Sequence, residues 1–127
     1  MKLVVGVCAQ GKLNYVMEKH HINDCVVWDG TLPDGAEPQG KTIVIDHFHN
    51  WVKERIRTGG NPEEEMIVFV ETHPVCVIIS DEIGNGIVPV DGFEREYRER
   101  TGRILVELAG RAEEVVRVIC GIGQKIK

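Results

Sequence analysis

The sequence predicts an α/β domain in three layers, with a mainly parallel sheet and helices on both faces. Three observations predict it. Short apolar, β-branched runs alternate with helical segments, as in chains that build parallel sheets through right-handed crossovers. The first run, residues 3–5, stops at Gly6 and leads through a glycine-containing turn into a helix. The length of 127 residues suits one domain, so we expect a single domain over residues 1–127.

Each expected strand is a short apolar run that ends at a polar or turn residue. Strands that are apolar on both faces are typical of a covered parallel sheet. The expected strands are residues 3–5, 25–28, 42–46, 75–80 and 115–120, with a turn at 121–123 and a tail or edge strand at 125–127.

Helical spacing and capping residues predict four helices, at residues 12–21, 47–57, 62–72 and 91–112. The third is contested, because residues 66–70 are strand-like whereas Asn61, Pro62 and three glutamates form a helix start. We expect a helix there, since Pro74 begins a cleaner strand. Residues 29–40 are rich in Gly and Pro and are expected to form a loop.

Composition excludes several classes of protein. With 20 acidic and 15 basic residues the net charge is −5, which argues against a nucleic-acid surface. The four cysteines form no CxxC pair. They are expected to be small buried residues, with Cys8 in the candidate phosphate loop the more exposed one. No apolar run approaches the length of a membrane span, and the apolar run at the start of the sequence is too short for a signal peptide. A cytoplasmic protein is expected.

The turn after the first strand matches most of the phosphate-loop pattern GxxxxGK[ST]. Its glycines let the backbone fold around an anion, which N–H groups and the helix N-terminus attract, and Lys12 would reach the outer phosphates. Leu13 lacks the hydroxyl that normally holds Mg²⁺, and the alternative is a strand–helix turn with glycines for geometry. The expected nucleotide-binding residues are Gly6, Val7, Cys8, Ala9, Gln10, Gly11, Lys12 and Leu13.

Asp46 ends the strand at residues 42–46. In phosphate-loop enzymes an aspartate at this place holds Mg²⁺, usually through water; the alternative is an N-cap for the next helix. His47 and His49 follow, but residues two apart on a helix share no face, so a two-histidine metal site has little support. His20 and His21 end a predicted helix, and the negative end of the helix dipole favours histidine there. We prefer this structural explanation to a functional one.

Glu82 and Asn85 lie in the segment EIGNGIVP after the strand at residues 75–80. Ligands of parallel sheets bind at the carboxyl ends of strands, which makes this a candidate active-site turn. Spacing alone favours a structural loop.

The carboxyl half resembles the adenosylcobinamide kinase/adenosylcobinamide-phosphate guanylyltransferase family. That family shows NEVGxGIVP after a strand, R-x-x-x-G-x-x-N in the next helix, and a final strand ending in GIGxxIK. The chain resembles the family less closely at its amino end, where GVCAQGKL stands against GGxxSGKS. The residues that carry the likeness are Glu82, Gly84, Gly86, Ile87, Val88 and Pro89, then Tyr97, Arg98 and Gly102, then Gly121, Ile122, Gly123 and Lys125.

The resemblance implies a RecA-like phosphate-loop NTPase fold, a homotrimer, and a role in cobalamin biosynthesis. Its reactions are phosphorylation of adenosylcobinamide by ATP or GTP, and then GMP transfer from GTP. By this likeness Lys12 and Glu82 are the catalytic candidates and Asp46 the Mg²⁺ candidate; the partners are a nucleotide and a corrinoid.

Two departures from the family leave alternatives open. The segment between the phosphate loop and Asp46, which carries the family's guanylylated histidine, is much shorter here, and neither His20 nor His21 maps onto that histidine. Guanylyltransfer is therefore doubtful, and Leu13 puts the kinase step in question. The alternatives are a catalytically impaired paralogue that binds nucleotide or corrinoid in a regulatory or assembly role, and a structural subunit.

Overall fold

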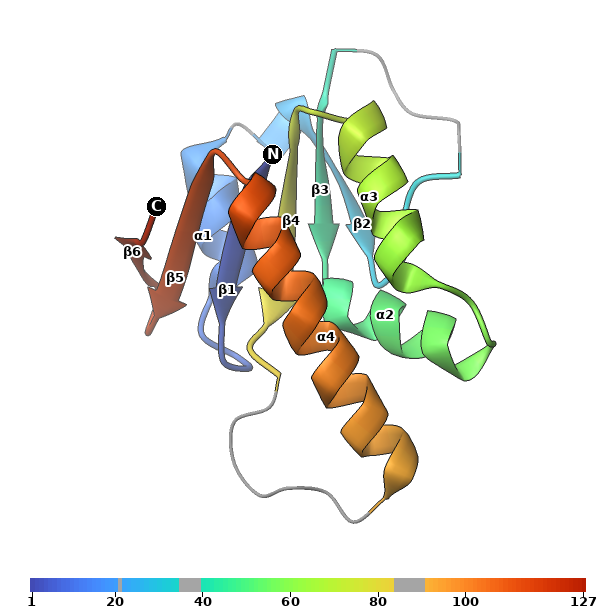
Figure 1. Ribbon diagram of the computed structural model, residues 1–127. Coiled ribbons are helices and arrows are strands. Elements are labelled where there is room, and N and C mark those ends of the chain that lie inside the picture. The colour runs from blue at the N-terminus through green and yellow to red at the C-terminus, as the bar shows by residue number, and fades with distance from the viewer. Residues whose placement is uncertain (21, 35–39, 84–90) are drawn as a thin grey trace.

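The computed structural model describes residues 1–20, 22–34, 40–83 and 91–127. Its centre is a six-stranded sheet in the order β2-β3-β4-β1-β5-β6 (Figure 1). The first five strands are parallel, and β6 runs antiparallel to β5. The strands are β1 (Lys2–Gly6), β2 (Cys25–Asp29), β3 (Thr42–Asp46), β4 (Cys76–Asp81), β5 (Glu114–Ile119) and β6 (Ile122–Lys125).

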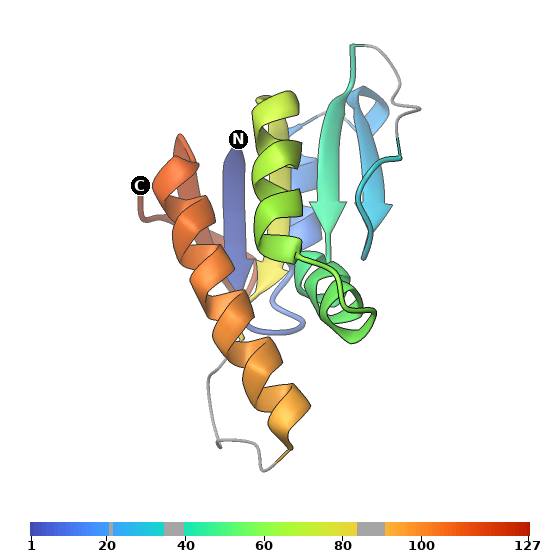
Figure 2. The ribbon, with the colours of Figure 1, turned by 45° about the vertical axis from the view of Figure 1, so that its right-hand side comes forward.

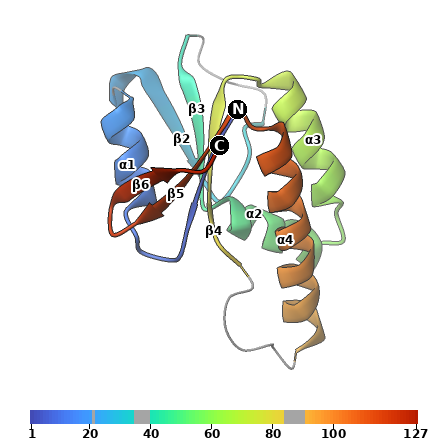
Figure 3. The same cartoon turned by 60° about the vertical axis from the view of Figure 1, so that its left-hand side comes forward.

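Helices cover both faces of the sheet, which confirms the predicted fold class. Figures 2 and 3 show α3 and α4 side by side on one face and α1 on the other. Helix α2 lies where β3 and β4 end (Figure 1). The helices are α1 (Lys12–Lys19), α2 (Phe48–Arg57), α3 (Pro62–Thr72) and α4 (Gly92–Arg111), with a 3₁₀ turn, η1, at Ile22–Asp24.

The two faces bury apolar clusters of different size. The larger cluster joins β1, β3 and β4 to α2, α3 and α4, with Phe48, Ile45 and Leu108 fully buried. The smaller one lies under α1, around Val16, Val44 and other valines of the strands. None of the helices in the described part of the chain is long and apolar enough to cross a membrane.

The contested segment at residues 62–72 is helical, as its cap predicts. The Asn61 side chain accepts a hydrogen bond from the Glu64 N–H at 3.3 Å, and Pro62 occupies the first turn. Met66, Phe69 and Val70 face the core at helical spacing. The cap and the buried stripe outweigh the strand propensity of residues 66–70, because β propensity is context-dependent.

The carboxyl end differs from the expectation. The turn was expected at residues 121–123, but it lies at Cys120 and Gly121, and β6 begins at once with Ile122. Cys120 and Gly121 have φ of 50° and 77°, and two successive positive φ values are those of the tight turn that suits a twisted hairpin. The strand that was expected at 125–127 therefore starts three residues earlier.

Candidate functional site

The predicted phosphate loop connects β1 to α1 and borders a cavity of about 250 Å³. Residues 8–14 line this cavity together with Asp46, His47 and Asp81. We call this space the Lys12 cavity. Because β1, β3 and β4 are parallel, their carboxyl ends lie at one edge of the sheet, where such folds bind ligands. The structure thus brings the loop and Asp46 together.

The loop backbone offers donors to this cavity. In the part of the chain that the structure describes, the backbone N–H groups of residues 8–11 donate no hydrogen bond. Gly11 is the N-cap of α1, with φ of 81° and no side-chain cap. Unpaired N–H groups at a helix N-terminus are favourable partners for an anion.

Lys12 is held inside the loop by two oxygens. Its Nζ donates to the Val7 carbonyl at 2.7 Å and lies 2.8 Å from Asp81 Oδ1. The side chain is only 8% exposed, and that of Asp81 is 17% exposed. The ammonium group is therefore fixed at the cavity, but Asp81 is a carboxylate that a phosphate would have to displace or share.

Asp46 does not cap α2, so the N-cap alternative is wrong. His47 occupies the N-cap position, with φ of 51°, and its N–H donates to Asp46 Oδ1 at 2.9 Å. The Asp46 carboxylate is 10% exposed and borders the Lys12 cavity. Its second oxygen suits the oxygen-rich, water-mediated coordination that Mg²⁺ prefers, although Leu13 adds no hydroxyl. The donor set fits a Mg²⁺ ion that accompanies a nucleotide.

His47 lies between two aspartates. Its Nδ1 is 2.5 Å from Asp29 Oδ1 and 3.4 Å from Asp46 Oδ2. The hydrogen bond to Asp29 raises the pKa of His47 above its ordinary value, and the charges of Asp46, Asp29 and Asp81 add to this rise. The imidazole therefore stays protonated to a higher pH than a free histidine would.

His49 contacts a different carboxylate. Its Nδ1 accepts from the Asp81 N–H at 3.1 Å, and its Nε2 lies 3.4 Å from Asp81 Oδ2. Burial lowers the pKa of His49, so the neutral ring is favoured. As expected for residues two apart, the two histidines serve different partners. His49 positions Asp81, which in turn holds Lys12.

Glu82 follows Asp81 but does not border the Lys12 cavity. Its two carboxylate oxygens accept from Arg117 of β5, with Nε–Oε1 at 2.8 Å and Nη2–Oε2 at 3.1 Å. Its backbone N–H donates to the Gly6 carbonyl at 2.9 Å. The rest of the predicted turn, residues 84–90 with Asn85, lies outside the described residues.

The β5–β6 hairpin contacts the Gly6–Leu13 loop and holds it in place. Gln10 accepts two backbone hydrogen bonds from the hairpin turn, through its side chain from Cys120 at 2.7 Å and through its carbonyl from Gly121 at 2.8 Å. A β-carbon on Gly11 would touch the Gly121 Cα at 3.4 Å. The turn at Cys120 and Gly121 therefore braces the loop.

Sequence reasoning missed Asp81 and Asp29 as site residues. Each is the last residue of its strand. A carboxylate is common at that position without any functional role, so nothing in the sequence singled these two out. Only the sheet order, with β4 between β3 and β1, shows that Asp81 faces Lys12. A search for acids at the ends of all predicted strands would have found both.

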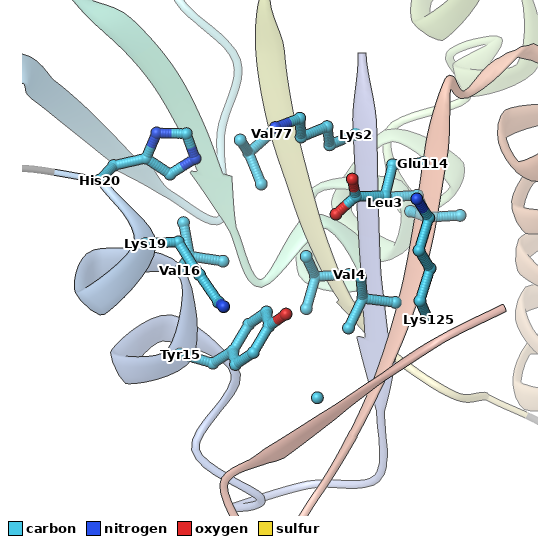
Figure 4. Close-up of a pocket in the computed structure, with 12 residues that line it drawn as sticks. Lys2, Leu3, Val4, Tyr15, Val16, Lys19, His20, Val77, Glu114 and Lys125 are labelled. Atoms are coloured by element: carbon cyan, nitrogen blue, oxygen red, sulfur yellow. The ribbon is translucent and has the colours of Figure 1, made fainter. Parts of the chain in front are cut away.

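A second cavity, of about 420 Å³, lies on the α1 face and contains none of the predicted site residues. Figure 4 shows its apolar floor at Val4 and Val77, with Tyr15 on one side and Lys125 and Glu114 on another. Volume alone would favour this space. The Lys12 cavity carries the convergent charged groups and loop donors, so we assign the candidate site there.

Comparison with known proteins agrees with this fold. The family model described as "Cobinamide kinase / cobinamide phosphate guanyltransferase" matches residues 20–126. The match contains Asp46, Asp81 and Glu82, and it begins after the Gly6–Leu13 loop. The assignment of the loop therefore rests on its own sequence pattern and on its geometry.

Two curated relatives are similar to parts of this chain. The "Bifunctional adenosylcobalamin biosynthesis protein CobU" of Salmonella typhimurium (strain LT2) is 45% identical over 69 residues, which are 51% of this chain and 38% of that protein. The protein of the same name from Escherichia coli (strain K12) is 45% identical over 51 residues, 40% of this chain and 28% of that protein. The matched segments thus span less than half of either relative. Because the family model covers most of the chain, this protein belongs to the cobinamide kinase/cobinamide phosphate guanyltransferase family.

Proposed function

We propose that the chain acts in cobalamin biosynthesis by binding ATP or GTP in the Lys12 cavity and phosphorylating adenosylcobinamide. The carrying observation is that Lys12, the donors of the Gly6–Leu13 loop and the Asp46 carboxylate border one cavity at the carboxyl ends of parallel strands. The cavity is small, and its size suits the phosphate end of a nucleotide. The base and the corrinoid would lie beyond it.

The charges of the cavity favour a nucleotide that arrives with a cation. Besides His47, the lining holds one positive group, Lys12, and two carboxylates, Asp46 and Asp81. Because these charges nearly balance when His47 is protonated, this set would neutralise little of the charge of a bare triphosphate. A Mg²⁺ ion held at Asp46 would neutralise the phosphates and stabilise the charge that develops during phosphoryl transfer.

In the proposed reaction, the hydroxyl oxygen of the cobinamide side arm forms a bond to the γ-phosphorus. The bond from that phosphorus to its bridging oxygen breaks, and the nucleoside diphosphate leaves. Lys12 would hold the outer phosphates, and Glu82 remains the proposed acceptor of the hydroxyl proton. Glu82 would first have to exchange its pair with Arg117 for the substrate hydroxyl.

Guanylyltransfer is not part of the proposal, because no histidine of the shortened segment takes the place of the family's guanylylated residue. Incubation with GTP labelled at the α-phosphate should leave no covalent label on the protein. A labelled histidine would show that the second reaction is retained. The trimer that the family resemblance implies and the cytoplasmic location that the sequence predicts remain predictions.

Calorimetry with ATP, GTP and Mg²⁺ tests the binding step. We expect nucleotide binding that raises the melting temperature and that Lys12→Ala abolishes. Lys19→Ala is the matched control, because Lys19 lies at the opposite end of α1. This variant should bind nucleotide as the native protein does. Absence of binding at millimolar nucleotide would refute the proposal.

A second candidate function is nucleotide or corrinoid binding without catalysis, in a regulatory or assembly role. It is favoured by Leu13, which packs against the apolar cluster under α1 and offers no hydroxyl to a metal. Transfer of label from the γ-phosphate to adenosylcobinamide separates the candidates. Binding with no transfer supports the second candidate, and transfer that Lys12→Ala removes supports the first.

A further inference from the structure

Two aspartates and one histidine converge at the ends of β2 and β3, beside the Lys12 cavity. Asp29 and Asp46 are register partners on neighbouring parallel strands. Residues paired in this way project to the same side, and neighbouring strands lie about 4.8 Å apart. The Gly30 N–H donates to the Asp46 carbonyl at 2.8 Å, so the two strand ends are tied together and both carboxylates lie at one point of the sheet edge.

His47 completes the cluster. Its Nδ1 faces Asp29 Oδ1 and Asp46 Oδ2 together, and one ligand atom from each of the three residues lies within 4.8 Å of the others. The His47 N–H binds Asp46 Oδ1, which leaves Oδ2 turned toward the imidazole. Three potential donors on two strand ends and a helix N-cap thus lie within reach of one ion, which on binding would displace the proton that joins Nδ1 to Asp29.

We propose that Asp29, Asp46 and His47 bind a first-row divalent transition metal ion, such as Mn²⁺, Co²⁺ or Zn²⁺. Carboxylates alone would suit Mg²⁺ or Ca²⁺, but an imidazole nitrogen favours transition ions. Hydrated Mg²⁺ also demands near-ideal octahedral oxygen coordination, which a nitrogen donor between two carboxylates does not provide. Without nucleotide the site therefore favours these ions over Mg²⁺, whereas the Mg²⁺ of the proposed function would arrive bound to the phosphates.

The site has room for exogenous ligands. Three protein donors leave coordination positions open for water or substrate, as in catalytic rather than structural metal sites. Asp46 and His47 also line the Lys12 cavity, so an ion held here would border the place proposed for the phosphates. The metal site does not depend on that function, because its three donors are assembled without a nucleotide.

Titration of the full chain with Mn²⁺ in the absence of nucleotide tests the site, with the free ion measured by electron paramagnetic resonance. Mn²⁺ is the probe because, unlike Zn²⁺, it prefers oxygen ligands to soft thiolates, so the exposed thiols of Cys8 and Cys120 do not compete. We expect one ion per chain and binding of Mg²⁺ that is at least about 10-fold weaker. Equal affinity for the two ions would overturn the proposed selectivity.

Variants identify the ligands. Asp29→Asn and His47→Ala should each weaken Mn²⁺ binding by about 10-fold or more, whereas the controls Asp34→Asn and His20→Ala should not. The Asp29 side chain is 71% exposed, so its substitution should leave the fold intact. Lys12→Ala should lose nucleotide but retain Mn²⁺, which separates this inference from the proposed function. Native affinity in Asp29→Asn and His47→Ala would refute the site.

Discussion

The Lys12 ammonium group and the Asp81 carboxylate form a nearly buried ion pair, with Nζ 2.8 Å from Oδ1. The pair joins the start of α1 to the end of β4, and His49 holds Asp81 from the other side. A phosphate in the cavity would compete with Asp81 for the same ammonium group. The two partners should therefore affect anion binding in opposite directions.

Binding of pyrophosphate without metal should distinguish Lys12→Ala from Asp81→Asn. Both changes remove the ion pair, so a purely structural effect would shift both variants in the same direction. If Lys12 binds the phosphates, Lys12→Ala should lose binding, and Asp81→Asn should tighten it by about 10-fold, or about 1.4 kcal/mol. Calorimetry with EDTA present measures both. Weaker binding in both variants would contradict the assignment.

The cysteines provide a reporter of ligand in the loop. Cys8 is exposed and lines the Lys12 cavity, whereas Cys120 is exposed at the hairpin turn. Burial raises the pKa of Cys76 to about 11, so this thiol should not react in the native protein. A nucleotide with Mg²⁺ should slow alkylation of Cys8 and leave that of Cys120 unchanged.

Mass spectrometry of the alkylated protein measures both rates in one sample. Cys120 is the internal control, because general stabilisation would slow both thiols together. Unchanged labelling of Cys8 at a nucleotide concentration that saturates binding would place the nucleotide away from the loop.

Most of the fold could be predicted from the sequence because its signals are local. Apolar runs such as residues 42–46 and the Asn61–Pro62 cap each specify one element without outside help. The start of β6 could not be predicted, because Ile122–Lys125 has little strand pattern and is ordered by pairing with β5. Its tight turn also uses Cys120 at positive φ, which the residue type does not suggest.

The site was less predictable, because it depends on sheet order. The loop pattern identified Lys12, and the strand end identified Asp46. That Asp81 binds Lys12 and Asp29 binds His47 follows from strand neighbours that sequence spacing does not specify. Glu82 is the opposite case. Its place in a motif suggested a residue of the site, but its carboxylate accepts a hydrogen bond from Arg117 of β5.

Gly6 marks a close approach of β1 and β5. A β-carbon at this position would lie 2.6 Å from the Val118 carbonyl oxygen, a backbone atom that cannot turn away. Gly6→Ala should therefore lower the free energy of unfolding by about 1–3 kcal/mol. Gly102→Ala is the control: a β-carbon there meets nothing within 4 Å in the middle of α4, and it should stabilise by about 0.5–1 kcal/mol.

Chemical denaturation of both variants measures these changes. If Gly6 served only loop flexibility, Gly6→Ala would raise the unfolding free energy as Gly102→Ala does. Such a result would contradict the close approach of the two strands.

The ion pair between Glu63 of α3 and Arg100 of α4 should make the free energy of unfolding depend on pH in the acidic range. It is bidentate, with Nε–Oε1 at 2.7 Å and Nη2–Oε2 at 2.8 Å, and it lowers the pKa of Glu63 from its ordinary 4.5. A lowered pKa means that the folded state favours the charged carboxylate. The contribution is complete well above pH 4.5 and is lost as the pH falls through the folded-state pKa.

Glu63→Gln should therefore cost about 0.5–1 kcal/mol at pH 7, a value that allows for solvent screening of a partly exposed pair. The difference from the native protein should shrink below pH 4.5 and vanish once Glu63 is protonated. Glu99→Gln is the control, since its pair with Arg103 is exposed and 3.4 Å long and should contribute little at any pH. Urea unfolding from pH 7 to pH 3 measures the trend, and a Glu63→Gln difference that is constant over this range would show that the pair does not couple α3 to α4 through charge.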